Sequence, residues 1–460
     1  MTAPPTGPAP TPAELADVPA QWTRLHPLSP LITFARTLGV VLVIIVPRLA
    51  TRSGDLVGLG VEAGILLLGV VAGFISWLVT RWRVSGNELQ IETGLLRRQS
   101  IRLPLARVQA IDIDRPLLAR VFGLAELRLQ VAGSGSGRGR LAYLPEAEAS
   151  RVRAQLLALA NGLHGGTPAP TGQLLFTVDN RRLVLATLLG TPSLVLVVLA
   201  AVAVVLGVLT DSATTGLGMI PPIFAVAALL WRRLNAEFGL TVVEAPDGLR
   251  VDGGLLGTRH ETIPLPRVQA VRWDEPLLWR PFGWCRLEID VAQQREARRD
   301  DNSAFPDRAL LPVGTRQQAS AVLARVLPDV DPYRALDARP PARARFKAPL
   351  AYRNLGLWSD ERYVVCGSGV LRRRLVVVPL AKVQSLRFVQ GPYARLLRLA
   401  TVHIDLVGRA WHAAAHARDE GEADQLWPVL AGRARRARSG AGRRVSAPST
   451  SERLSEQQPI

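Results

Sequence analysis

One short phrase recurs three times in this chain of 460 residues, and no other feature constrains its fold as strongly. It reads LPLARVQAIDI from Leu103, IPLPRVQAVRW from Ile263 and VPLAKVQSLRF from Val378. In each copy a Gly stands ten residues before the Pro, and Pro-Leu-x-[Arg/Lys]-Val-Gln follows. The shared positions are Gly94, Pro104, Arg107 and Gln109, then Gly254, Pro264, Arg267 and Gln269, then Gly369, Pro379, Lys382 and Gln384. Such recurrence predicts three copies of one structural unit, so we interpret the phrase as a signature of a fold and not as an active site.

The residues around each phrase predict short strands followed by one helix. VQAIDI, VQAVRW and VQSLRF alternate with a period of two, as half-buried antiparallel strands do. Helical patterns begin near Pro145, Pro312 and Asp419, where proline and acidic residues favour a helix start. We therefore predict modules at residues 80–163, 232–330 and 331–432, the last including a linker.

These motifs resemble a known family. The Gly-x-Leu run, the Pro-Leu-x-[Arg/Lys]-Val-Gln run and the Phe-Gly-Leu-Ala of the first copy are similar to the bacterial pleckstrin-homology (PH) domain of type 2, found in YdbS-like membrane proteins. The resemblance implies a bent antiparallel barrel-like sheet capped by a C-terminal helix, placed beside paired transmembrane helices. The third copy departs from the pattern, because its proline is shifted and Arg398 replaces the glycine found at Gly123 and Gly283.

Four apolar segments predict membrane spans, since about 20 apolar helical residues cross a bilayer core. They are residues 31–46, 56–79, 183–209 and 213–231, and the third has no charge. The spans of each pair lie close together in sequence, which predicts two hairpins at 25–79 and 183–231. The expected fold class is therefore α+β and membrane α, with four transmembrane helices in two hairpins and three PH-like modules.

The basic flanks of these spans predict their orientation. Six arginines flank the sides that carry the modules: Arg81, Arg83, Arg181, Arg182, Arg232 and Arg233. The short opposite turns carry Arg48 and Arg52. The positive-inside rule then places the modules and both termini in the cytoplasm, in a multi-pass protein of the cell membrane. We expect residues 1–24 to be a disordered lead, 164–182 a linker and 433–460 a disordered basic tail.

The charge balance predicts an anionic partner. Lys and Arg number 56 against 38 Asp and Glu, a net charge of +18. In a membrane protein this favours the anionic leaflet over nucleic acid, because the basic tail has no interleaved aromatic residues. The candidate lipid contacts are Arg97, Arg98, Arg372, Arg373, Arg374, Arg433, Arg435 and Arg436. A solvated basic edge without a specific headgroup site is the alternative.

No catalytic, cofactor or metal pattern stands out. His412 and His416 are four residues apart but have no evident third ligand, and the glycine-rich stretch 132–140 lacks the ending of a phosphate loop. Glu62 is an intramembrane candidate if it lies deep in the bilayer, although a position near the outer interface is favoured. We interpret the glutamines of the repeat as hydrogen-bonding the backbone at a bend.

Two main functions remain open from the sequence, and nucleic-acid binding through the basic tail is a third, which predicts loss of binding when residues 431–460 are deleted. The first is a non-enzymatic scaffold that self-associates, or docks a partner protein or lipid, with the exposed edges of its sheets as one docking site. The alternative is a transport or lipid-handling role for the helices, regulated by the modules. The shortage of intramembrane charges counts against an ion pathway.

Overall fold

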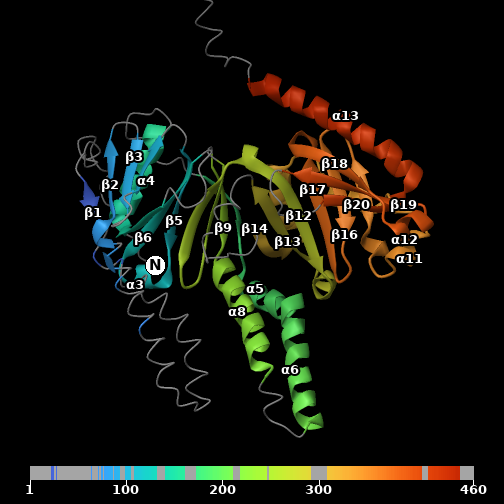
Figure 1. Ribbon diagram of the computed structural model, residues 1–460, viewed down its shortest axis with the longest axis horizontal. Helices are drawn as coiled ribbons and strands as arrows, with labels where there is room; N and C mark the ends of the chain where they lie inside the picture. The colour runs from blue at the N-terminus through green and yellow to red at the C-terminus, as the bar shows by residue number, and fades with distance from the viewer. Residues whose placement is uncertain are drawn as a thin grey trace, which may run out of the picture. The chain divides into compact units, whose positions relative to one another are not determined.

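The computed structural model divides the chain into two compact units, Met1–Gln173 with Glu244–Thr262, and Leu174–Val243 with Ile263–Ile460. The described residues are 22–24, 27, 29, 64, 71, 74–75, 77–85, 88–93, 99–104, 108–131, 140–160, 172–210, 218–245, 248–291, 308–406 and 413–445 (Figure 1). Predictions for the first hairpin, the N-terminal lead, Glu62, Gly94, Arg97, Arg98 and Arg107 fall wholly or mostly outside these residues.

Module 1 consists of two antiparallel sheets and a C-terminal helix. Its strands are β1 (Thr23–Arg24), β2 (Arg81–Ser85), β3 (Glu88–Thr93) and β4 (Gln99–Pro104), then β5 (Val108–Arg115), β6 (Leu124–Val131) and β7 (Arg140–Pro145), with helices α3 (Leu117–Val121) and α4 (Glu146–Ala160). The first four strands pair in chain order, and so do the last three. Leu89 and Ile91 alternate inward on β3 and pack with Trp82, Leu127 and Leu156 in the core.

Module 2 repeats this order, and its strands are divided between the two units. The bounds are β9 (Thr241–Ala245), β10 (Gly248–Gly253), β11 (Thr258–Ile263), β12 (Val268–Pro276), β13 (Trp284–Val291), β14 (Arg308–Thr315) and α10 (Arg316–Val326), with 3₁₀ turns η2 (Leu265–Arg267) and η3 (Leu277–Phe282). Strands β12, β13 and β14 are antiparallel neighbours. Thr315 and Gln318 form a capping box that fixes the start of α10.

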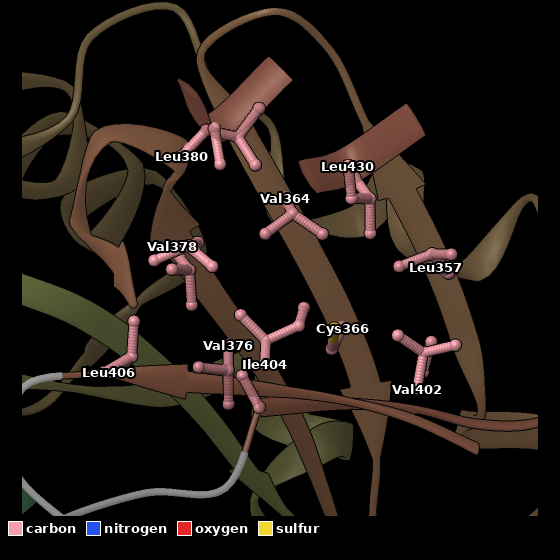
Figure 2. Close-up of a cluster of buried hydrophobic side chains, with 14 of the residues drawn as sticks. Leu357, Val364, Cys366, Val376, Val378, Leu380, Val402, Ile404, Leu406 and Leu430 are labelled. Atoms are coloured by element: carbon pink, nitrogen blue, oxygen red, sulfur yellow. The ribbon is translucent and has the colours of Figure 1, made fainter. Parts of the chain in front are cut away.

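Module 3 has the same organisation. Its elements are η4 (Pro332–Leu336), α11 (Ala344–Lys347), η5 (Tyr352–Asn354), β15 (Gly356–Ser359), β16 (Tyr363–Ser368), β17 (Arg372–Pro379), η6 (Leu380–Lys382), β18 (Val383–Val389), α12 (Pro392–Leu396), β19 (Leu399–Leu406), β20 (Ala413–Asp419) and α13 (Glu420–Val445). Figure 2 shows its core, a cluster that includes Val364 of β16, Val376 of β17, and Val402 and Ile404 of β19. Leu430 of α13 belongs to the same cluster, so the helix closes the module.

The third predicted span is interrupted. Residues 180–209 form two helices, α5 (Asn180–Leu188) and α6 (Thr191–Leu209), and not one continuous helix. Gly190 is the N-cap of α6 and Pro192 lies in its first turn, where a residue without an amide proton is tolerated. Leu183 and Ala186 of α5 are buried, which explains why the apolar run is longer than α6.

The fourth predicted span overlaps helix α8 (Ile220–Glu237), and its first residues, 213–217, lie outside the described residues. Helix α8 continues past the predicted end of the span, through Arg232 and Arg233. Within the described part of the chain, α6 alone is long and apolar enough to cross a membrane, with a mean hydropathy of 2.8. Four transmembrane helices are therefore not confirmed.

Two predicted irregular segments contain regular structure. The linker 164–182 includes β8 (Gln173–Thr177) and the start of α5. The basic tail is helical as far as Val445, because α13 continues past residue 433. Ala434 is buried and Arg438 Nη1 donates a hydrogen bond to the Val383 carbonyl at 2.6 Å, so contacts with module 3 stabilise this part of the helix.

Candidate functional site: strand pairing between modules

Modules 1 and 2 share a sheet, which we call the first joint. Within the first unit β5 pairs antiparallel with β11, with Arg115 opposite Thr258, Asp114 opposite Arg259 and Ile113 opposite His260. The strand order there is β7-β6-β5-β11-β10. Strand pairing satisfies backbone groups that would otherwise form an open edge, so the joint removes an edge from each module.

Modules 2 and 3 share a sheet in the same way, which we call the second joint. Within the second unit β12 pairs antiparallel with β17 over six residue pairs, from Val271 opposite Val377 to Pro276 opposite Arg372. The Leu277 amide donates to the Leu371 carbonyl at 2.8 Å and continues the ladder. The result is one antiparallel sheet in the order β14-β13-β12-β17-β16-β15, which includes strands from both modules (Figure 1).

The two joints have the same register relative to the repeated phrase. In the first, the residue six after Gln109 lies opposite the residue four after Gly254. In the second, the residue six after Gln269 lies opposite the residue four after Gly369. A one-residue slip would turn every side chain to the other face of the sheet, so a shared register is a specific structural relationship. The joint is therefore a property of the repeat.

A residue of the C-terminal helix accounts for the different lengths of the two ladders. In module 1, Arg153 Nε donates to the Ile111 carbonyl at 3.1 Å. The Thr262 amide, which lies across from Ile111 in this register, donates to Asp112 Oδ1 at 3.3 Å. Leu323 takes the place of Arg153 in module 2, where it is a buried apolar side chain that cannot donate, and the ladder continues to Val271.

A buried carboxylate anchors the second joint. Glu275 is fully buried at the end of β12 and accepts a hydrogen bond from Arg316 Nε at 3.0 Å. Arg373 Nη1 of β17 approaches Glu275 Oε2 at 3.3 Å, so this ion pair joins the two modules. Tyr333 also hydrogen-bonds Glu275, and burial followed by this contact raises the pKa of the tyrosine. A buried charge with several donors is stable, whereas removing one donor is costly.

A second buried network connects helix α8 to module 2. Arg286 on β13 is 1% exposed, and its guanidinium makes two hydrogen bonds to Glu237, at 2.9 Å and 2.6 Å. Arg286 also bonds Glu288. Burial lowers the pKa of Arg286, but the two carboxylates outweigh burial and the net pKa is raised. Because Glu237 ends α8, this network fixes the helix to the sheet.

Three of the arginines that were predicted to contact lipid, Arg372, Arg373 and Arg374, lie on β17 at the second joint. Arg373 pairs with Glu275 and Arg374 pairs with Asp274 at 3.5 Å, while Arg372 lies opposite Pro276. On α13, Arg433 Nε lies 3.2 Å from Glu361 and Arg436 lies 3.5 Å from it, whereas Arg435 is exposed. Most of these charges therefore have protein partners, and lipid contact remains a prediction for them.

The repeated glycines have a steric role in the two described copies. Gly254 and Gly369 have φ values of +123° and +101°, which L side chains rarely adopt. A Cβ at either position would lie 1.8 Å from a backbone carbonyl oxygen, that of Gly257 or of Arg372. The glycines are therefore required by the turns that lead into β11 and β17.

The other signature residues are placed less uniformly. Pro264 and Pro379 directly precede the 3₁₀ turns η2 and η6, and Pro104 ends β4. Buried Gln269 donates to the Arg267 carbonyl at 3.2 Å, which agrees with a backbone-bonding role, but Gln384 is exposed. Gln109 lies on β5. Lys382 Nζ donates to the Pro266 carbonyl at 2.6 Å, a further contact between modules 2 and 3.

The buried charges were not predicted from the sequence, although a signal for them was present. In RLEIDV of β13, Arg286 and Glu288 are charged residues inside an alternating strand, and both are buried. Charged side chains are rarely buried unless they are paired. A search for opposite charges two residues apart on a predicted strand would have indicated the pair of Arg286 and Glu288.

Comparison with known proteins identifies the family. The family described as "Bacterial PH domain" matches residues 33–160, 180–330 and 342–434, most of the chain, and the chain belongs to this family. The chain is similar to the UPF0699 transmembrane protein YdbT of Bacillus subtilis (strain 168), with 21% identity over 267 residues. The match covers 50% of this chain and 53% of that relative, so the chain matches about half the length of the relative.

Proposed function

We propose that this protein is a non-enzymatic scaffold of the cell membrane, a multi-pass protein that presents its three PH-like modules on the cytoplasmic side. The observation that carries this proposal is the pair of joints. Modules connected only by flexible linkers bind independently, whereas modules that share a sheet in a fixed register hold neighbouring surfaces in place. A fixed arrangement of binding surfaces is what a scaffold requires.

The attachment to the membrane supports the same proposal. Helix α6 has the length and apolarity to cross a bilayer, and α8 is fixed to module 2 through Glu237 and Arg286. Helix α8 packs against α6, so a module fixed to α8 keeps one orientation toward a bilayer that α6 crosses. The basic composition of the chain favours an anionic leaflet beside the modules, and partner proteins would bind their remaining edges. No cofactor is part of this proposal.

The test is chemical crosslinking of the full chain in its native membrane, followed by affinity capture. We expect recovery of a defined partner protein or of a second copy of the chain. The control is the same chain with the second joint disrupted by Arg374→Glu, which places a carboxylate beside buried Asp274. Capture of neither a partner nor a second copy would overturn the scaffold proposal.

A further inference from the structure

Each joint pairs the strand that begins with Val-Gln in one module, β5 or β12, with the strand that precedes this phrase in the next module, β11 or β17. One strand of each of these two classes takes part in neither joint. Strand β18 of module 3 holds the place that β5 and β12 hold in modules 1 and 2. It is the outer strand of the sheet β18-β19-β20, and within the described part of the chain no strand pairs with its free side. Strand β4 of module 1 corresponds to β11 and β17, and it is the outer strand of β1-β2-β3-β4.

The exposure of β18 indicates a missing neighbour. Phe388 and Val389 are 38% and 44% exposed, while their counterparts on β12, Trp273 and Asp274, are 0% and 1% exposed. The two strands have the same position in their modules and differ in whether a neighbouring strand covers them. An uncovered strand edge with apolar side chains is a template for pairing with another chain.

We propose that β18 pairs with β4 of a second copy of this chain, in the register that both internal joints use. This inference rests on the scaffold function and gives it a partner and a site. The shared register places Val389 opposite Gln99 and Phe388 opposite Ser100. The occupant is a second copy because its β4 belongs to the same strand class that fills the equivalent edge in both internal joints.

The C-terminal helix of module 3 is compatible with this pairing. Trp427 Nε1 donates to the Leu386 carbonyl at 3.1 Å. This contact is equivalent to the one in module 1 between Arg153 and the Ile111 carbonyl, because the two donors have the same position in their helices and the two acceptors the same position in their strands. The first joint forms in the presence of that contact, and its ladder stops there. The joint between copies should therefore resemble the short first joint, with pairing beyond Leu386 toward the end of β18.

The charges at the proposed joint are also compatible. Both internal joints place an acid opposite a base, Asp114 with Arg259 and Asp274 with Arg374. The equivalent pair between copies is Val389 with Gln99, so no unpaired charge is buried there. Arg387 on β18 is already bonded to Asp405 within its own module, at 2.7 Å and 2.8 Å.

The two surfaces are different, so the association is head to tail. A contact between unlike surfaces of identical chains generates a ring if the rotation closes, or a filament if it does not. Copies attached to one membrane share the side on which their modules lie. The proposed joint therefore predicts either a closed ring or an open chain of copies, in which each β18 pairs with the β4 of another copy.

Disulfide trapping in membranes tests this register. Hydrogen-bonded and non-hydrogen-bonded residue pairs alternate along an antiparallel ladder. Leu277 and Leu371 form a hydrogen-bonded pair, so Asp274 and Arg374, three residues away on each strand, form a non-hydrogen-bonded pair. Val389 and Gln99 would be the same kind of pair, with Cα atoms about 4.5 Å apart, which suits a disulfide. Full-length chains carrying Val389→Cys and Gln99→Cys, with different tags, should crosslink on co-expression several-fold more than Val389→Cys with the out-of-register Ile101→Cys.

Three results would overturn the inference. The first is a yield for the Val389→Cys and Gln99→Cys chains no higher than for the out-of-register pair. The second is strong crosslinking of Val389→Cys chains with each other, which would mean that β18 pairs with β18. The third is a doubly substituted chain that crosslinks only within itself. The buried Cys285 and Cys366 are native residues, so the unsubstituted chain measures the background.

A second variant checks the oligomer without cysteines. Val389→Glu should reduce the oligomer mass in detergent or nanodiscs, while Leu396→Glu, at a 78% exposed position on α12, should not. An unchanged mass for Val389→Glu would contradict the proposal. If trapping fails but affinity capture still recovers a partner protein, the scaffold function stands and this inference alone is wrong.

Discussion

Glu275 forms an ion pair with Arg316, and module 1 contains the same contact with the charges exchanged, between Arg115 and Glu146. In both modules the pair joins the end of one strand to the first residue of the C-terminal helix. Module 3 has Gln390 in the place of Glu275, and this side chain donates to the Leu399 carbonyl at 3.2 Å. Modules 1 and 2 therefore share the position of this contact with opposite polarity, and module 3 replaces it with a hydrogen bond to β19.

Exchanging these charges should be tolerated in module 1 and not in module 2. Arg115→Glu or Glu146→Arg alone should lower the free energy of unfolding by about 0.5–1 kcal/mol, and the double variant should recover most of it, because the pair is partly exposed. Glu275→Arg with Arg316→Glu should not recover, because Arg373 would face the new arginine. Double-mutant cycles by denaturant unfolding measure both, and full recovery in module 2 would contradict this account.

Removing Arg286 should be the most damaging single change. Arg286→Met removes the cation that Glu237 and Glu288 share and leaves each with one other arginine, Arg233 or Arg272, at an expected cost of about 3 kcal/mol. Arg353→Met, at an exposed arginine on η5, is the matched control and should be nearly neutral. Thermal unfolding of the solubilised protein compares them, and equal melting temperatures would show that the network does not stabilise the fold.

Gly369→Ala should destabilise module 3 by about 1–3 kcal/mol, because a non-glycine residue there combines an unfavourable φ with a clash against the Arg372 carbonyl. Gly391→Ala is a matched control in the same module, since a Cβ there has no heavy atom within 4 Å. Limited proteolysis and denaturant unfolding report the difference. Equal stability of the two variants would refute the steric role of the repeated glycine.

Acid should weaken module 3 through His416. Burial, and then the nearby His403 and Lys347, lowers the pKa of His416 below its usual value of 6.5. The unfolded chain therefore takes up a proton before the folded chain does, so this contribution to stability is complete above about pH 6.5 and is lost as the pH falls below it. Melting temperatures measured from pH 7.5 to about pH 5 should decrease, and His416→Gln should flatten the slope. An unchanged slope would assign the effect to other groups.

Truncation should show which part of α13 stabilises module 3. Removing residues 446–460 should leave stability unchanged, whereas removing residues 431–460 deletes buried Ala434 and the bond from Arg438 to Val383. Leu430→Ala should cost about 2–5 kcal/mol, because its side chain lies in the core shown in Figure 2. A nucleic-acid or lipid binding test of the tail should therefore use the shorter truncation.

The sequence predicted what depends on local pattern. Three modules, the strands that begin at Val108, Val268 and Val383, and the final helix of each module follow from alternation and from the repeat. The joints were not predicted, because β5 and β11 are distant in sequence and their pairing depends on tertiary arrangement. The break at Gly190 was missed because residues 183–188 of α5 continue the apolar run of α6, although Leu183 and Ala186 are buried against protein.

The unequal charges of the joints have a consequence for how the chain selects its own partners while folding. Three similar modules in one chain offer several wrong strand pairings, and the phrase itself does not distinguish them. In the common register, β5 paired with β17 would place Arg115 opposite Arg373, and β12 paired with β11 would leave Glu275 opposite Thr258. The first of these wrong pairings places like charges together, and the second removes a partner from a buried acid, so the residues beside the repeated phrase help to distinguish one strand edge from another.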